Sequence, residues 1–100
     1  MARLRVAPAA ARDLQKISDE IATAAGKRVA LAFMERLRQS LEGLVQFPGM
    51  GRQRPAFGSG VRSWVVYPYV AFYRQAGLDV EIIRVVHGRR RITRRLLGAD

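Results

Sequence analysis

The chain has a first half in which apolar residues recur at helical spacing and a second half in which they form short β-branched and aromatic runs. In the first half, this spacing predicts one amphipathic helix from about residue 9 to residue 25 and another from residue 27 to about residue 46. Gly26 lies between them and predicts a tight turn, so the two helices should form an antiparallel hairpin. We expect two apolar stripes to pack in the core, namely Leu14, Ile17 and Ile21 in the first helix and Val29, Phe33, Leu37, Leu41 and Leu44 in the second.

Strands are predicted on both sides of this helical pair. A short alternating segment at residues 4–7 predicts an N-terminal strand. Three β-branched and aromatic runs, at residues 61–67, 69–74 and 79–86, are separated by only a few residues, which favours a three-stranded antiparallel meander. The predicted fold class is therefore α+β, with an N-terminal strand, a two-helix antiparallel hairpin and the meander packed against it.

Two segments show no extended helical or strand spacing of apolar residues. Residues 47–60 are rich in proline and glycine, which predicts a long irregular loop. Residues 89–97 predict a short C-terminal helix, in which Ile92 and Leu96 dock on the domain and the arginines face outward. No repeat or low-complexity segment divides the chain, so we expect a single domain over residues 1–100.

The charge of the chain points to an anionic partner. The sequence has 18 basic and 8 acidic residues, a formal net charge of +10. The imbalance is larger in the second half, where residues 51–100 carry ten basic and three acidic side chains. Every basic residue except Lys16 and Lys27 is an arginine, whose planar fork of donors suits phosphates and carboxylates. A nucleic acid or an acidic protein segment fits this composition.

Several other classes of protein are disfavoured. With no cysteine and with His87 as the one histidine, the sequence offers no ligand set with recognisable metal spacing, and we expect neither a metal nor another cofactor. The N-terminus has no signal-peptide pattern, and no apolar run is long enough to span a membrane. We therefore expect a cytoplasmic protein with no membrane partner.

Four segments of the sequence carry a family resemblance. They are Arg-Val-Ala-Pro-Ala-Ala-Ala-Arg-Asp-Leu at 5–14, Phe-Pro-Gly-Met-Gly-Arg at 47–52, Val-Arg-Ser-Trp-Val-Val-Tyr-Pro-Tyr-Val-Ala-Phe-Tyr-Arg at 61–74, and Ile-Arg-Val-Val-His-Gly-Arg-Arg at 83–90. In this order and spacing they resemble the RelE/ParE superfamily of toxins from bacterial type II toxin–antitoxin pairs, and more particularly its ParE branch. The resemblance covers essentially the whole chain.

This resemblance implies a small, basic toxin that is silenced by a cognate antitoxin, ParD-like or related, whose tail wraps around it. Toxins of the ParE type inhibit DNA gyrase, whereas those of the RelE type cleave messenger RNA on the ribosome. Both targets are rich in phosphate, so the charge of the chain is consistent with either. We expect the gyrase inhibitor, which needs no catalytic residue, and keep the ribosome-dependent endonuclease as the alternative.

Two surfaces follow from the gyrase hypothesis. The candidate target-binding residues are the arginines after the last strand, Arg89, Arg90, Arg91, Arg94 and Arg95. Apolar surface left between a helical hairpin and a sheet can be covered by a partner peptide. The candidate antitoxin-binding residues are therefore Leu14, Ile17, Phe33 and Leu37.

The nuclease hypothesis needs proton carriers and cations. Histidine has a pKa suited to proton transfer, which makes His87 one candidate carrier, and the second would have to be Tyr67, Tyr69, Tyr73 or Glu81. The cations that can stabilise a developing phosphorane charge are Arg62, Arg74, Arg84 and Arg89 to Arg91. The structural alternative for His87 is that it ends the last strand and makes a local hydrogen bond. We expect Trp64 and the tyrosines to pack in the core and its rim rather than to stack on bases.

A third hypothesis is a basic nucleic-acid-binding domain with no toxic action. The sequence has no recognisable helix-turn-helix, zinc finger or RNP pattern, which counts against it. Such a domain would bind plain nucleic acid tightly and with a steep dependence on salt.

Overall fold

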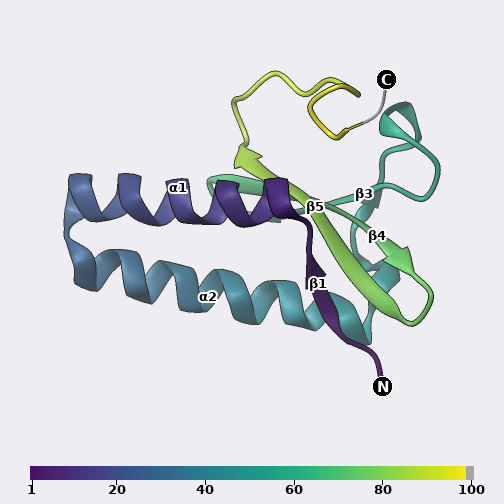
Figure 1. Cartoon of the computed structure of the whole chain (residues 1–100), viewed down its shortest axis with the longest axis horizontal. Coiled ribbons are helices and arrows are strands. Elements are labelled where there is room, and N and C mark those ends of the chain that lie inside the picture. Colours follow the sequence, from purple (N-terminus) through teal and green to yellow (C-terminus); the bar gives the residue numbers. More distant parts are fainter. Residues whose placement is uncertain (99–100) are drawn as a thin grey trace.

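A computed structural model describes residues 1–98 of the chain, as two helices, five strands and two 3-10 turns (Figure 1). In chain order these elements are β1 (Leu4–Val6), α1 (Pro8–Ala25), α2 (Lys27–Gln46), η1 (Pro48–Met50), β2 (Arg52–Gln53), η2 (Pro55–Phe57), β3 (Arg62–Val66), β4 (Tyr69–Ala76) and β5 (Asp79–His87). The α+β fold predicted from the sequence is confirmed.

The two helices form the predicted antiparallel hairpin, which lies on one side of the sheet (Figure 1). Pro8 occupies the first turn of α1, where its missing N–H is not needed. Gly26 ends that helix with a φ of 95°, a conformation that side chains disfavour. Of the predicted stripes, Ile17, Leu37, Leu41 and Leu44 are buried, whereas Val29, near the turn between the helices, is exposed.

The five strands form one mixed sheet in the order β1-β5-β4-β3-β2. The predicted meander is confirmed, because β3, β4 and β5 pair antiparallel in succession. The N-terminal strand β1 pairs in parallel with β5, on the far side of the meander from β3. Residues 47–60 were predicted to form an irregular loop, and this prediction was wrong for part of that range. Arg52–Gln53 pairs with the start of β3, and 3-10 turns flank it.

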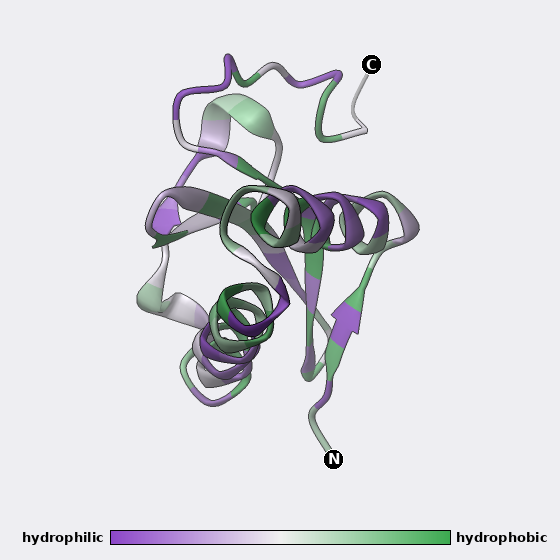
Figure 2. Cartoon of the chain, turned by 90° about the vertical axis from the view of Figure 1, so that its left-hand side faces the viewer, coloured by the Kyte–Doolittle hydropathy of each residue, from purple (hydrophilic) through white to green (hydrophobic). Residues whose placement is uncertain are grey.

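The two faces of the sheet are covered by different parts of the chain. The helix-facing side packs against the hairpin through a cluster that includes Tyr73, Ile82 and Val85. The opposite side, called the outer face below, packs Phe72 and Val86 against the C-terminal segment and η2. Figure 2 shows the helices nearly end-on, with the C-terminal segment at the other end of the molecule from α2. The domain therefore has a second, smaller core on its outer face.

The C-terminal segment, residues 88–98, does not form the short helix predicted for it. Turns take its place, in which Leu97 N–H donates to the Arg94 carbonyl and Gly98 N–H to the Arg95 carbonyl. A helix here would align arginines four residues apart, and so short a helix lacks the length to offset nucleation. Ile92 and Leu96 nevertheless dock on the outer face, as predicted, and Leu97 is buried.

A tyrosine from β4 fixes the loop that follows α2. The Tyr73 hydroxyl donates to the Pro48 carbonyl at 2.8 Å and accepts the Gly51 N–H at 2.8 Å. Gly51 has no side chain, which lets the loop backbone approach this ring and the Ser63 carbonyl closely.

Within residues 1–98, neither helix combines the length and apolar composition needed to cross a membrane.

We predict that Gly51→Ala lowers the free energy of unfolding by about 1–3 kcal/mol, the usual cost of overpacking. The new Cβ would lie 2.7 Å from the Ser63 carbonyl oxygen and closer still to the Tyr73 hydroxyl. Gly43→Ala is the matched control, because its Cβ would have no atom within 4 Å and lies inside α2. It should raise the free energy of unfolding by about 0.5–1 kcal/mol. Urea denaturation measures both, and equal effects would contradict the role assigned to Gly51.

Candidate functional site

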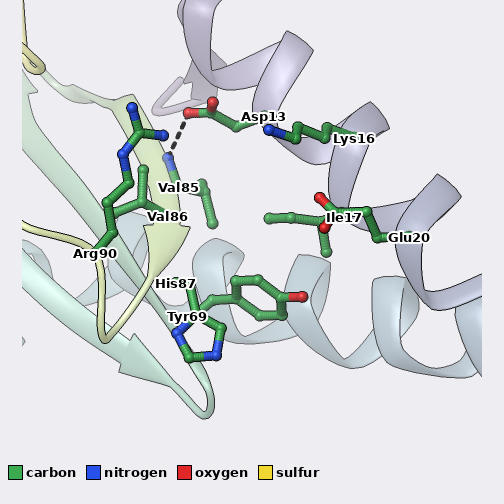
Figure 3. A pocket seen from close by; sticks show the side chains of 9 residues that line it. All are labelled: Asp13, Lys16, Ile17, Glu20, Tyr69, Val85, Val86, His87 and Arg90. Carbon is green, nitrogen blue, oxygen red and sulfur yellow. Dashed lines mark hydrogen bonds between the residues drawn. The ribbon is translucent and has the colours of Figure 1, made fainter. Parts of the chain in front are cut away.

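A pocket of about 200 Å³ opens between α1 and the C-terminal end of β5 (Figure 3). Asp13, Lys16, Ile17 and Glu20 of α1 form one wall, and the remaining lining residues are Tyr69, Val85, Val86, His87 and Arg90. The pocket therefore joins His87, which the sequence singled out, to charged residues from the first helix. It is the place in the described structure where a histidine, a tyrosine and charges of both signs meet.

The pocket exists because β1 is shorter than β5. Strand β1 pairs only with Val80 to Ile82, so the edge of β5 beyond Ile82 has no neighbouring strand. Helix α1 takes the place of that strand, and the Asp13 carboxylate accepts the Val85 N–H at 2.9 Å, drawn as a dashed line in Figure 3. A side chain of α1 thus satisfies a strand donor that would otherwise lack a protein partner.

The same carboxylate binds Arg84. Nε and Nη2 of Arg84 donate to the two oxygens of Asp13 at 2.7 and 2.9 Å, which is a bidentate ion pair. The side chains are 17% exposed for Arg84 and 13% for Asp13. The hydrogen bond to Asp13 raises the pKa of the Arg84 guanidinium, so this arginine stays charged. Arg84 is fully engaged in holding the fold.

His87 ends β5 at the mouth of the pocket. Its Nδ1 accepts the Arg89 N–H at 3.1 Å, so the proton of the neutral imidazole lies on Nε2. Its ring meets the Tyr69 ring edge-on, with centroids 5.7 Å apart. Burial raises the pKa of the Tyr69 hydroxyl, and the Glu20 carboxylate raises it further. The local hydrogen bond is the structural role that the sequence offered for His87.

Of the cations proposed for a nuclease, Arg90 lines this pocket, whereas Arg62, Arg74 and Arg84 are not gathered there. Arg62 donates to the Gly51 carbonyl at 2.8 Å and supports the loop after α2. Arg74 forms an exposed ion pair with Glu81 at 3.3 Å. Neither lines the pocket that contains His87, and Arg84 is bound to Asp13. The structure therefore brings His87 together with Tyr69 but leaves the three arginines in separate structural contacts.

Sequence reasoning missed the contribution of α1 to this site. Asp13, Lys16 and Glu20 lie about 70 residues from His87 in the chain and read as the solvated side of an amphipathic helix. Their spacing of three and four residues was a signal that they share a face with Ile17. What the sequence did not contain was the pairing of β1 with β5, which brings that face to the end of the last strand.

The five arginines predicted to bind the target, Arg89, Arg90, Arg91, Arg94 and Arg95, are all exposed. They follow one another along the segment that crosses the outer face, and Arg90 also lines the pocket. None of them pairs with an acidic side chain of the described residues 1–98. Together they form a basic surface, and no carboxylate in the described part of the chain neutralises its charge.

The residues predicted to bind an antitoxin lie at different depths. Leu14 and Leu37 line a second, apolar groove of about 120 Å³ between β1 and the two helices, with Leu37 buried at its base. Phe33 is partly buried and packs against Tyr69, with ring centroids 5.6 Å apart. Ile17 is buried and lines the His87 pocket instead. The four residues therefore lie on the two helices of the hairpin but do not all line one groove.

Trp64 packs as predicted, on the helix-facing side of the sheet, where its Nε1–H donates to the Ser40 hydroxyl at 2.9 Å. In the described residues, no group of three or more histidine, cysteine or acidic side chains is arranged to hold a metal ion.

Comparison with known proteins places this fold and sequence in one family. The family described as "ParE toxin of type II toxin-antitoxin system, parDE" matches residues 4–92. The chain belongs to the ParE family of toxins. The match ends before Arg94 and Arg95, so the last two arginines of the basic surface lie beyond it.

Individual relatives agree with this assignment. Toxin ParE3 of Caulobacter vibrioides is 32% identical over 84 residues, which is 84% of each chain. Toxin ParE1 of the same organism is 36% identical over 62 residues, 62% of this chain and 64% of the relative. A solved structure, described as the chromosomal ParDE toxin–antitoxin system from P. aeruginosa, aligns with a TM-score of 0.73 at 28% identity. That alignment covers 87% of this chain and 96% of the other. The expected RelE/ParE superfamily and its ParE branch are confirmed.

The raised pKa of Tyr69 predicts a loss of stability at alkaline pH. A tyrosine whose pKa is higher in the folded than in the unfolded state contributes stability that is complete below about pH 10 and is lost as the pH rises further. Between about pH 8 and pH 11, Tyr69→Phe should therefore lose less unfolding free energy than the wild type. Glu20→Gln should lose an intermediate amount of unfolding free energy, because it removes the carboxylate charge that adds to burial in raising the pKa of Tyr69. Identical losses in all three proteins, measured by urea denaturation, would contradict this prediction.

Proposed function

We propose that this ParE-family toxin inhibits DNA gyrase through the exposed arginines of its C-terminal segment. The proposal rests on the five exposed arginines of the C-terminal segment in this ParE-family chain. None of them has a carboxylate partner among the described residues. Gyrase acts on DNA, so its working complex presents phosphates as well as protein surface. Arginine forks bind both phosphates and carboxylates through charge-assisted hydrogen bonds.

The chemistry of the chain supports inhibition by binding. The pocket at His87 includes Tyr69 and the cations Lys16 and Arg90. Three of the arginines proposed for RNA cleavage, however, are bound outside it: Arg84 to Asp13, Arg62 to Gly51 and Arg74 to Glu81. Binding requires only complementary charge and shape, which the basic surface offers. The inhibitor would act in the bacterial cytoplasm, where gyrase and DNA are located.

We further propose a ParD-like antitoxin as the partner that silences this toxin. The aligned P. aeruginosa structure is described as a ParDE system, so a toxin of this fold occurs there together with its antitoxin. The apolar groove at Leu14 and Leu37, together with the exposed edge of β1, offers surface that an extended or amphipathic tail can cover. An acidic tail would also offset the net charge of +10.

The direct test is a supercoiling assay with purified toxin, gyrase, relaxed plasmid and ATP, followed by protease treatment and gel electrophoresis. We expect lost supercoiling or linear DNA, and we expect that adding the cognate antitoxin restores normal supercoiling. Unchanged plasmid topology with a folded toxin would overturn the proposal. Cleavage of messenger RNA that requires ribosomes would then identify the alternative, and salt-sensitive binding to plain nucleic acid would identify the non-toxic domain.

Two variants separate the basic surface from the histidine. Arg94→Gln combined with Arg95→Gln should raise the toxin concentration for half-inhibition by about tenfold or more, which corresponds to about 1.4 kcal/mol of lost binding free energy. His87→Ala should leave that concentration within about twofold of wild type, because the contacts of its ring, with the Arg89 N–H and with Tyr69, involve neither Arg94 nor Arg95.

The reverse pattern would support the nuclease hypothesis. If His87→Ala abolishes toxicity while circular dichroism and antitoxin binding are unchanged, and the double arginine variant remains fully toxic, the basic surface is not the functional site.

A further inference from the structure

Arg84 makes hydrogen bonds in two directions. Its Nε and Nη2 bind the Asp13 carboxylate on α1, and its Nη1 donates to the Leu96 carbonyl at 2.8 Å. One side chain of β5 therefore joins the first helix to the C-terminal segment that carries the arginines. Because the guanidinium is planar and its donors are fixed relative to one another, binding Asp13 on one side aims Nη1 on the other.

The Asp13 end of this connection is rigid. Besides Arg84, the Asp13 carboxylate accepts the Val85 N–H, so it is held by both the backbone and a side chain of β5. Ala10 and Ile17, one turn to either side of it on α1, are buried. A β-bulge next to Arg84 also shifts the strand by one residue, so that Ile82 and Val85 both face the helices. We call Asp13 and Arg84 together the clasp.

The other end has little else to hold it. The amides of Arg89 and Arg90 bind His87 at the end of β5. Beyond Arg90, the bond from Arg84 to Leu96 is the only hydrogen bond between the described part of the C-terminal segment and the rest of the chain. Ile92, Leu96 and Leu97 add apolar contacts, which, unlike a hydrogen bond, are non-directional.

We propose that Asp13 and Arg84 are positioning residues, which hold the C-terminal segment in one arrangement and so present its arginines as a fixed set. This role rests on the proposed function, in which those arginines bind the gyrase complex. If a loosened segment adopts the binding arrangement only a fraction of the time, its apparent affinity falls by that fraction. Pre-organisation by the clasp would therefore matter for target binding although neither residue touches the target.

Two conservative substitutions test the clasp. Arg84→Lys keeps the charge but replaces the planar fork with a single ammonium, which loses the bidentate bond to Asp13 that aims Nη1 at the Leu96 carbonyl. Asp13→Asn keeps the shape and an acceptor for the Val85 N–H but removes the anion. Matched controls on α1 are Arg12→Lys and Asp19→Asn, which make the same exchanges at exposed positions outside the clasp.

Two measurements are made on each folded full-length variant. Hydrogen–deuterium exchange of residues 88–98, followed by mass spectrometry, reports whether the segment is held. The supercoiling assay reports how strongly the toxin inhibits gyrase. Both clasp variants should exchange faster in this segment and need about tenfold more toxin for half-inhibition, as expected if the bound arrangement is populated about a tenth of the time. Circular dichroism and antitoxin affinity should be unchanged, and both controls should match wild type.

The outcomes separate the clasp from the proposed function. Unchanged exchange of residues 88–98 in both variants would overturn the clasp. A parallel loss of inhibition, antitoxin binding and thermal stability would also overturn it, because Asp13 and Arg84 would then support the whole fold. Faster exchange confined to the segment supports the clasp even if wild type fails to inhibit gyrase, and in that case the proposed function is what fails.

Discussion

The shortness of β1 is the constraint on which the rest of this structure depends. Its three residues pair with the first half of β5, and beyond Ile82 the same edge of β5 has no neighbouring strand. An open strand edge inside a domain must be covered or its polar groups go unsatisfied. Helix α1 begins directly after β1 and brings Asp13 to the uncovered edge. The pocket at His87, the ion pair with Arg84 and the position of the C-terminal segment all follow from that arrangement.

The arrangement also divides the sheet into two faces with different tasks. The helical hairpin packs against one face and builds the main core, with Tyr73, Ile82 and Val85 at its centre. The outer face is covered by loops and turns, which bury only a small cluster around Phe72. Segments with few backbone hydrogen bonds and little buried surface are the least stable parts of a protein. Placing the exposed arginines on such a segment makes their arrangement sensitive to the few bonds that hold it.

Most of the fold follows from sequence patterns that are local. The helical stripes, the glycine between the helices and the three strand runs each set an element within one or two residues of its observed bounds. The errors arose where long-range contacts decide the outcome. Arg52–Gln53 is a strand only because β3 lies beside it, and residues 88–98 remain in turns on a face that offers apolar docking sites. For the site, the sequence supplied His87 and the arginines, but the contribution of Asp13 and Glu20 depends on which strand β1 joins, which no local pattern encodes.

Arginine content alone is a poor guide to where this protein acts, because identical side chains serve opposite purposes here. Arg62 and Arg84 are bound by carbonyl oxygens or a carboxylate of the chain itself, and Arg54 lies over the rings of Phe57 and Phe72. These three arginines make contacts within the fold, and replacing Arg62 or Arg84 would leave a carbonyl or carboxylate partner without its hydrogen bond. Arg94 and Arg95 are exposed on a turn and keep their donors available to solvent. Burial and partners, rather than residue type, separate the arginines that build the domain from those available to an anionic target.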